Sequence, residues 1–296
     1  MRFHSLLIIT AIVLLLASCA APAVTPTVTA TIAPTPTSGV DPCLTTAKTY
    51  KPGMLPPGRI AFECYSDPNK IINIYVFDTT TGNIVNLTDD TFINYGVQWS
   101  PDGQQIAFHS NRRGRSGIYL MNADGTQLKW LVDGKSAYWS PDGSKIVIIR
   151  TDGVYVADKN SNDMVRIADN RSVLGQASWS PDGTQIALDL LQQDRRPMVY
   201  VANVDGSQQA KLANFPENSF NPTWSPTDRT IAALRINGKE LDLYKMQVDN
   251  GTPVQLTHDL PLVEWFSWSP NGQQIAFIAS IGPKNQLYVM NTRVLC

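Results

Sequence analysis

Residues 99–103 read Trp-Ser-Pro-Asp-Gly, and the same five residues return at 139–143 and again at 179–183. Two variants follow, Trp-Ser-Pro-Thr-Asp at 224–228 and Trp-Ser-Pro-Asn-Gly at 268–272. Successive copies begin 40, 40, 45 and 44 residues apart. A period of about 40–45 residues is typical of the four-stranded blades of a β-propeller. The repeat therefore predicts an all-β fold built from such blades.

The residues around each motif predict four antiparallel strands per blade. The Trp ends the first strand, and Ser-Pro-Asp-Gly forms a tight turn, because Pro fixes its φ, Asp bonds nearby amides and Gly tolerates a positive φ. Apolar triplets then mark the second strand, at residues 106–108, 146–148, 186–188, 231–233 and 275–277. A Tyr marks the third strand, at Tyr119, Tyr155, Tyr200, Tyr244 and Tyr288. The fourth strand is expected to end in Leu, as at Leu131, Leu212 and Leu256.

A sixth copy precedes the others, because residues 60–62 match the second strand and Tyr75 matches the third. The last copy ends after its third strand. Residues 43–45 (Cys-Leu-Thr) resemble the fourth-strand ends at 86–88 and 255–257. We therefore expect a six-bladed propeller over residues 41–296, in which an N-terminal strand at 41–47 completes the last blade and removes the free sheet edges.

The first 40 residues predict export and anchoring. Residues 1–18 read as a lipoprotein signal peptide, with Arg2 before an apolar run too short to span a bilayer comfortably. Residues 16–19 (Leu-Ala-Ser-Cys) resemble the bacterial lipobox, which implies acylation of Cys19. The remainder of segment 19–40 is rich in Thr and Pro and predicts a disordered tether. We expect anchoring to the outer face of the cytoplasmic membrane or to the outer membrane.

Composition excludes several classes of protein. The chain has 296 residues, a formal net charge of −1 and only 17% charged residues. These values exclude a generally basic nucleic-acid-binding protein and a highly charged disordered chain. We expect the closed propeller to be one cooperative unit with no internal domain boundary. We also expect a monomer, with no cofactor.

The four cysteines allow alternative pairings in an exported protein. A Cys43–Cys296 disulfide would staple the expected closing strand to the end of the last blade. The rival pairing is Cys43–Cys64, and three free thiols are the third alternative. In the first case Cys64, on a second strand, is expected to be a buried free thiol.

The repeat resembles the TolB-type β-propeller family, whose motif is also found in the propeller halves of prolyl-oligopeptidase-like peptidases. The resemblance covers residues 41–296 and is specific for fold, not for function. It implies that the motif tryptophans pack between blades, and these are Trp99, Trp139, Trp179, Trp224 and Trp268. It also implies that the motif aspartates form turns.

We find no catalytic or metal-binding constellation in the sequence. No Gly-x-Ser-x-Gly elbow of a peptidase occurs, and no sialidase-type Asp box. Outside the signal peptide the only histidines are His109 and His258, which are too few for the usual ligands of a metal-dependent lyase. We therefore expect a protein that is not an enzyme, with no metal site.

Charge suggests which face binds a partner. With the four strands of a blade lettered a to d, the a–b and c–d turns carry many aspartates. The b–c loops carry Arg112, Arg113, Arg115, Arg195 and Arg196. We therefore expect an envelope scaffold whose arginine-bearing face binds a protein or another anionic polymer. Two alternatives stay open. One is a carbohydrate- or small-ligand-binding propeller, with Phe92, Tyr95, Phe220 and Trp265 as candidates for a funnel lining, and the other is a cryptic periplasmic hydrolase or lyase.

Overall fold

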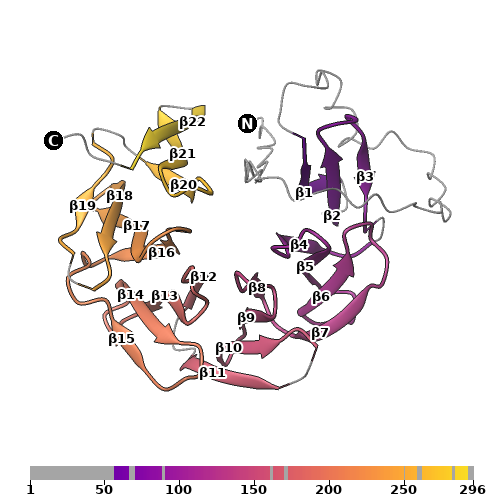
Figure 1. Cartoon of the computed structure of the whole chain (residues 1–296), viewed down its shortest axis with the longest axis horizontal. Coiled ribbons are helices and arrows are strands. Elements are labelled where there is room, and N and C mark those ends of the chain that lie inside the picture. The colour runs from indigo at the N-terminus through magenta and orange to yellow at the C-terminus, as the bar shows by residue number, and fades with distance from the viewer. Residues whose placement is uncertain are drawn as a thin grey trace, which may run out of the picture.

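The computed structural model describes residues 57–66, 71–88, 91–160, 163–169, 173–249, 251–258, 262–281 and 284–292. Within these ranges the chain forms six antiparallel sheets that follow one another around a ring (Figure 1). The prediction of an all-β, six-bladed propeller is therefore confirmed. The described ranges contain no helix, and so none that is long and apolar enough to cross a membrane.

Each sheet is one blade, and its strands follow in chain order from the centre outward. Blade 1 contains β1 (Arg59–Ser66), β2 (Ile71–Asp78) and β3 (Ile84–Asn86). Blade 2 contains β4 (Asn94–Trp99), β5 (Gln105–Ser110), β6 (Gly117–Asn122) and β7 (Lys129–Asp133). Blade 3 contains β8 (Ser136–Trp139), β9 (Lys145–Ile149), β10 (Gly153–Asp158) and β11 (Met164–Asp169).

The second half of the ring repeats the same order. Blade 4 contains β12 (Val173–Trp179), β13 (Gln185–Leu191), β14 (Pro197–Asn203) and β15 (Gln209–Lys211). Blade 5 contains β16 (Ser219–Trp224), β17 (Thr230–Asn237), β18 (Glu240–Gln247) and β19 (Val254–Gln255). Blade 6 contains β20 (Val263–Trp268), β21 (Gln274–Ile281) and β22 (Lys284–Asn291).

The fourth strands differ slightly from expectation. We expected them to end in Leu, but β15 and β19 end just before Leu212 and Leu256. Both leucines still donate their amides to the third strand, from Leu212 N to Val199 O at 2.9 Å and from Leu256 N to Leu243 O at 2.7 Å. The pairing therefore continues for one residue beyond each short strand.

The Ser-Pro-Asp-Gly turn is held by its own side chains. In blade 2 Ser100 Oγ donates to Asp102 Oδ1 at 2.6 Å, and the same oxygen accepts from the Gln104 amide at 3.0 Å. Gly103 has a φ of 66° and donates its amide to Ser100 O. In blade 3 the equivalent bonds, led by that from the Ser140 hydroxyl, lower the pKa of Asp142 to about 2. The motif aspartates thus act as turn formers.

The motif tryptophans lie between neighbouring blades. Trp179 belongs to a buried cluster with Val147 and Val156 of blade 3, and its Nε1 donates to Tyr138 O across the interface at 2.9 Å. Trp268 makes the matching bond to Thr223 O of blade 5 at 3.2 Å. Burying such large side chains supplies much of the hydrophobic stabilisation between blades.

Two carboxylates also join neighbouring blades near the centre of the ring. Glu63 lies in β1, which takes the place in blade 1 that the second strand takes in the other blades. It accepts the amides of Gly96 and Val97 at 2.6 and 3.2 Å, where the first strand of blade 2 bulges. Asp189 holds the same position in blade 4 and accepts the amide of Asn221 at 2.9 Å, at the bulge in blade 5. Gly96 and Asn221 both have positive φ, of 68° and 53°.

The described chain begins in blade 1 and ends in blade 6, and these two blades are neighbours in the ring (Figure 1). Blade 6 has three described strands, and its last strand, β22, is an edge of its sheet. Leu287 and Val289 on β22 are 64% and 61% exposed, whereas Leu243, which occupies the place of Leu287 in blade 5, is fully buried. The expected closing strand at 41–47 lies outside the described residues, so closure by the N-terminus stays a prediction.

If residues 41–47 complete blade 6, Leu44 should pack as Leu256 does in blade 5. Leu44→Asp should then lower the free energy of unfolding by at least about 2 kcal/mol, because it replaces a buried aliphatic side chain with a charge. Urea denaturation measures this difference. Val24→Asp in the expected tether is the matched control, and equal stability of the two variants would contradict the closure.

The cysteine expectations need one correction. Cys64 is half-buried near the end of β1 and is disulfide-bonded, so its interpretation as a buried free thiol is wrong. Its partner, like Cys43 and Cys296, lies outside the described residues. A Cys43–Cys296 bond would leave only Cys19 to pair with Cys64, and that would conflict with acylation of Cys19. The rival Cys43–Cys64 pairing has no such conflict.

Candidate binding face

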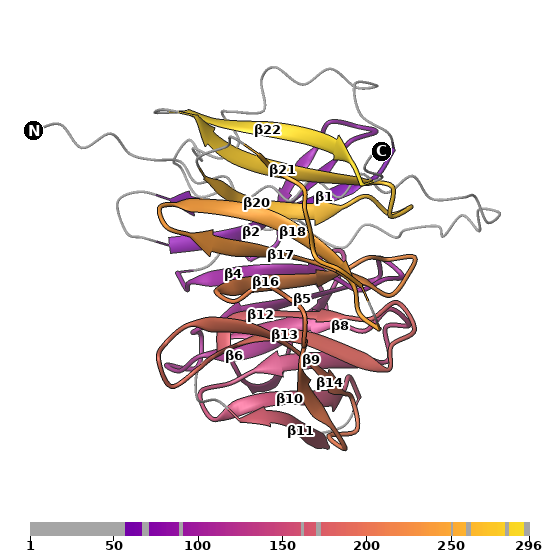
Figure 2. The same ribbon diagram turned by 90° about the vertical axis from the view of Figure 1, so that its left-hand side faces the viewer.

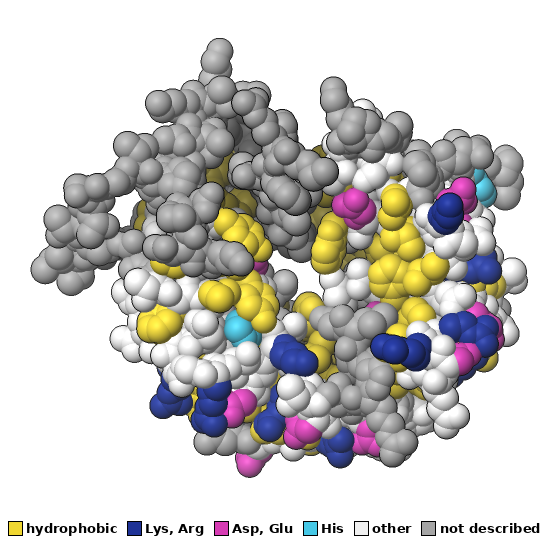
Figure 3. All heavy atoms as spheres, turned by 180° about the vertical axis from the view of Figure 1, so that it is seen from behind, with side chains coloured by type: hydrophobic (Ala, Val, Ile, Leu, Met, Phe, Trp, Pro, Cys, Tyr) yellow, Lys and Arg dark blue, Asp and Glu magenta, His cyan; other side chains and the backbone are white. Residues whose placement is uncertain are grey.

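The strand directions divide the ring into two faces. The a–b and c–d turns lie on one side, here called the turn face, and the b–c and d–a connections lie on the other, here called the loop face. Figure 2 shows the strands running between them. Figure 3 shows the loop face, which is hollowed at its centre, with hydrophobic side chains near the opening and Lys and Arg among Asp and Glu toward the rim.

In blade 2, Arg112 is used inside the protein. Its guanidinium carbon lies 5.0–5.7 Å from the centres of three aromatic rings, those of Phe92, Phe108 and Tyr119. Its Nη2 also donates to Asn94 Oδ1 at 3.0 Å. Cation–π contacts and this bond fix the side chain against the strands. Arg112 therefore organises the β5–β6 loop, and it is a poor candidate for contacting a partner.

The other two arginines of this loop are more available. Arg113 lies over the ring of Trp130, with its guanidinium carbon 5.0 Å from the ring centre. Arg115 pairs with Asp133 at 3.1 Å, and their side chains are 62% and 39% exposed. An exposed ion pair of this kind contributes less than about 1 kcal/mol. Arg115 is the more exposed member of the pair, so its guanidinium can also meet a carboxylate of a partner.

The arginines of blade 4 lie in the hairpin loop between β13 and β14. Arg196 forms ion pairs with Asp194 at 2.5 Å and with Glu217 at 3.0 Å. Bonds from the amide and the guanidinium of Arg196 lower the pKa of the Asp194 carboxyl. Arg195 is exposed and has a φ of 64°, and its guanidinium makes no hydrogen bond or ion pair with the part of the chain that the structure describes. The five predicted arginines thus form two groups, separated by blade 3.

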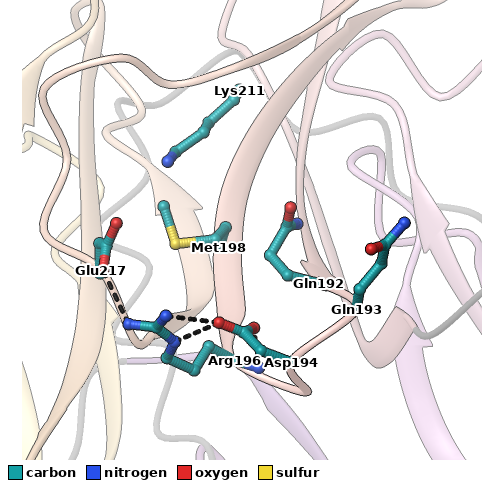
Figure 4. Close-up of a pocket in the computed structure, with 7 residues that line it drawn as sticks. All are labelled: Gln192, Gln193, Asp194, Arg196, Met198, Lys211 and Glu217. Carbon is teal, nitrogen blue, oxygen red and sulfur yellow. Dashed lines mark hydrogen bonds and ion pairs between the residues drawn. The ribbon is translucent and has the colours of Figure 1, made fainter.

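A groove beside this hairpin loop was not predicted from the sequence. It has a volume of about 470 Å³ and is lined by Gln192, Gln193, Asp194, Arg196, Met198, Lys211 and Glu217 (Figure 4). The lining residues come from a hairpin loop, two strands and the connection to blade 5. Of these seven residues, only Arg196 was a candidate from the sequence. Met198, Lys211 and Glu217 belong to other segments, and the pairing register of the blade brings them to the loop.

The central opening is bordered by a second group of residues. His109 is 3% exposed and stacks on Tyr95 with 4.1 Å between ring centres. Neither of its ring nitrogens has a hydrogen-bond partner in the described structure. Of the other candidates for a funnel lining, Phe92 and Trp265 are 36% and 41% exposed, whereas Phe220 packs against the core between blades 5 and 6.

Burial lowers the pKa of His109 from 6.5 to about 4. The unfolded chain therefore binds a proton between these values that the folded chain does not, so stability falls as the pH is lowered from about 6.5 toward 4. His109→Phe should reduce the loss of unfolding free energy between pH 7 and pH 4.5 by about 2 kcal/mol. Urea denaturation at both pH values measures this loss, with the exposed His258→Phe as control. A wild-type loss in His109→Phe would contradict the assignment.

The sequence of the propeller matches a known protein family. Residues 44–154 and 151–294 match the TolB beta propeller domain family. The chain belongs to this family. The resemblance expected from the repeats is therefore confirmed, and the family match covers the whole described ring.

Two curated relatives illustrate the range of the TolB beta propeller domain. The Tol-Pal system protein TolB of Francisella tularensis subsp. mediasiatica is 25% identical over 232 residues, which are 71% of this chain and 52% of the relative. A protein of Bacillus subtilis named as the uncharacterized peptidase YuxL is 37% identical over 81 residues, which are 26% of this chain and 12% of the relative. The chain thus spans about half or less of the length of these two relatives.

Solved structures share the fold with proteins of different activities. TolB from Acinetobacter baumannii superposes with a TM-score of 0.64 at 22% identity, over 79% of this chain and 61% of that one. An oligogalacturonate lyase in complex with manganese superposes with a TM-score of 0.58 at 11% identity, over 80% of this chain and 71% of that one. At such identities the likeness shows the fold alone, so function must be argued from the residues of this chain.

Proposed function

We propose that this chain is a non-catalytic binding propeller of the bacterial envelope, held to a membrane through acylated Cys19 and engaging a protein partner with its loop face. The lipobox at residues 16–19 and the Thr- and Pro-rich segment that follows support the anchor and the tether. Membership of the family that includes TolB supports a binding role in the envelope.

The proposal rests on how the arginine side chains of the loop face are ion-paired. Arg115 and Arg196 are exposed and pair only with the carboxylates of Asp133, Asp194 and Glu217. The Arg195 guanidinium is unpaired within the described chain. Such groups lose little when they leave their internal partners, because water already weakens those pairs. Charged residues at a rim accelerate and orient association with a partner of opposite charge.

The histidine near the centre argues against a catalytic alternative. A general base or metal ligand must reach the substrate or ion, but His109 is 3% exposed and stacked on Tyr95. The motif aspartates are occupied by their own turns, as Asp102 is by Ser100 and Gln104. These residues therefore support a binding role.

Exposed aromatic side chains favour one alternative, a carbohydrate- or small-ligand-binding propeller. Phe92 and Trp265 are more exposed than core aromatics and lie in or near the connections of the loop face. Titration of tryptophan fluorescence with neutral oligosaccharides tests this alternative. It requires a change that is lost in Trp265→Ala.

The anchor is tested by fractionation. Cys19→Ser removes the thiol that an acyl chain would modify, so the variant should leave the membrane fraction and appear as soluble exported protein. Ser18→Ala, which keeps the cysteine, is the control and should stay with membranes. The anchor hypothesis fails if Cys19→Ser remains membrane-bound after a high-salt wash.

The loop face is tested by affinity capture from native envelopes. Arg113→Glu/Arg115→Glu should reduce recovery of a captured protein at least about tenfold, because two attractive contacts become repulsive. Arg112 is left intact because it supports the fold. Lys129→Glu/Lys145→Glu makes the same change in charge on the turn face and should leave recovery unchanged. Identical recovery with both double variants would contradict a partner on the blade 2 loop.

A further inference from the structure

The hairpin loop of blade 4 keeps a strained residue at its tip. Arg195 N donates to Gln192 O at 2.9 Å, and the same turn occurs in blade 2, where Gly114 N donates to Asn111 O at 2.8 Å. Gly114 has a φ of 74° and Arg195 a φ of 64°. Glycine adopts this conformation freely, whereas an L-residue with a side chain loses about 1 kcal/mol. At this turn position blade 4 therefore has an exposed, strained Arg, whereas blade 2 has an unstrained Gly.

The seven lining residues carry two cations and two carboxylates, and Arg195, at the tip of the same loop, adds one further positive charge beside the groove. Both carboxylates of its lining, Asp194 and Glu217, are paired with the single guanidinium of Arg196 (Figure 4). The side chain of Lys211 is exposed and forms no hydrogen bond or ion pair with any described residue. Lys211 and Arg195 are thus the two cations here without a counter-charge among the described residues. An anionic ligand would meet both without displacing Asp194 or Glu217.

The floor of the groove is apolar, and one of its sides is the edge of a β-sheet. Met198 is 3% exposed and presents an apolar, polarizable surface beneath the polar walls. Lys211 is the last residue of β15, which among the described strands pairs only with β14 and forms the edge of blade 4. An edge strand offers unpaired backbone groups to an extended peptide. The groove thus combines an apolar floor, free cations and a sheet edge.

We propose that this groove binds a carboxylate side chain of an acidic polypeptide segment. The aliphatic stem of a glutamate lies over Met198, and its carboxylate meets Lys211 Nζ and the Arg195 guanidinium. The neighbouring peptide groups pair with the free edge of β15. This inference rests on the proposed function in taking the partner to be a protein, and it assigns the contact to blade 4.

A peptide fits the groove better than an acidic polysaccharide does. None of the seven lining residues is aromatic, so a sugar ring would find no flat apolar surface on which to stack. The amide of Gln192 is already bonded to the Tyr200 hydroxyl at 3.1 Å, which leaves Gln193 as the free amide for hydroxyl groups. A glutamate side chain needs only the floor and the cations.

The experiment measures binding of a labelled hexapeptide of alternating Glu and Ala by fluorescence anisotropy, with full-length protein in low salt. Lys211→Gln and Arg195→Gly should each weaken binding about threefold to tenfold, since each removes one charge contact. Arg195→Gly should also raise the melting temperature by relieving the strained φ. Lys145→Gln on the turn face is the matched control and should bind as wild type does.

Four outcomes would overturn the proposal, and the last of them leaves the proposed function untouched. The first is no binding of the Glu/Ala peptide beyond that of a Gln/Ala peptide. The second is binding that Lys211→Gln leaves unchanged. The third is a polygalacturonate oligomer that binds more tightly with the same dependence on Lys211, which would assign the groove to a polysaccharide. An envelope protein captured through Arg113 and Arg115, but insensitive to Lys211→Gln, would refute the groove while leaving the proposed function intact.

Discussion

Each motif tryptophan packs against the blade before it, and the ring depends on this contact. A single four-stranded sheet of this length has two apolar faces and cannot bury both by itself. Trp179 covers the apolar side chains of blade 3, and Trp268 covers those of blade 5. The Ser-Pro-Asp-Gly turn follows directly and sets where the first strand ends. One five-residue motif therefore fixes both the turn and the interface between blades.

The loops are free to vary because this framework does not need them. The β5–β6 and β13–β14 connections have the same turn, yet one holds Arg112 among aromatic rings and the other exposes Arg195. Position on a stable scaffold, with little packing demand, is where binding residues concentrate in proteins generally. Similar propellers serve as TolB, lyase and peptidase domains, which is consistent with function carried by the loops.

The sequence predicts the framework well because its signals are local and repeated. Turn residues, the apolar triplets and the third-strand tyrosines lie within one blade, so six copies and their strands follow from spacing alone. The groove depends instead on Lys211, Met198 and Glu217, which belong to separate segments and show no shared pattern. Arginine clusters in the sequence likewise did not reveal that Arg112 is held by rings from three elements. The disulfide of Cys64 depends on which cysteines approach in space, and spacing leaves that open.

The carboxylates of Glu63 and Asp189 make two junctions between blades, 1 to 2 and 4 to 5, different from the others. Each accepts amides from the inner strand of the following blade, and each faces a bulge with a positive φ at Gly96 or Asn221. At the same place blades 2 and 3 carry His109 and Ile149. Exchanging or duplicating modules would thus separate each acid from the inner-strand amides that it accepts. These two junctions therefore favour one order of blades around the ring. They limit how blades can be exchanged or added without losing these hydrogen bonds.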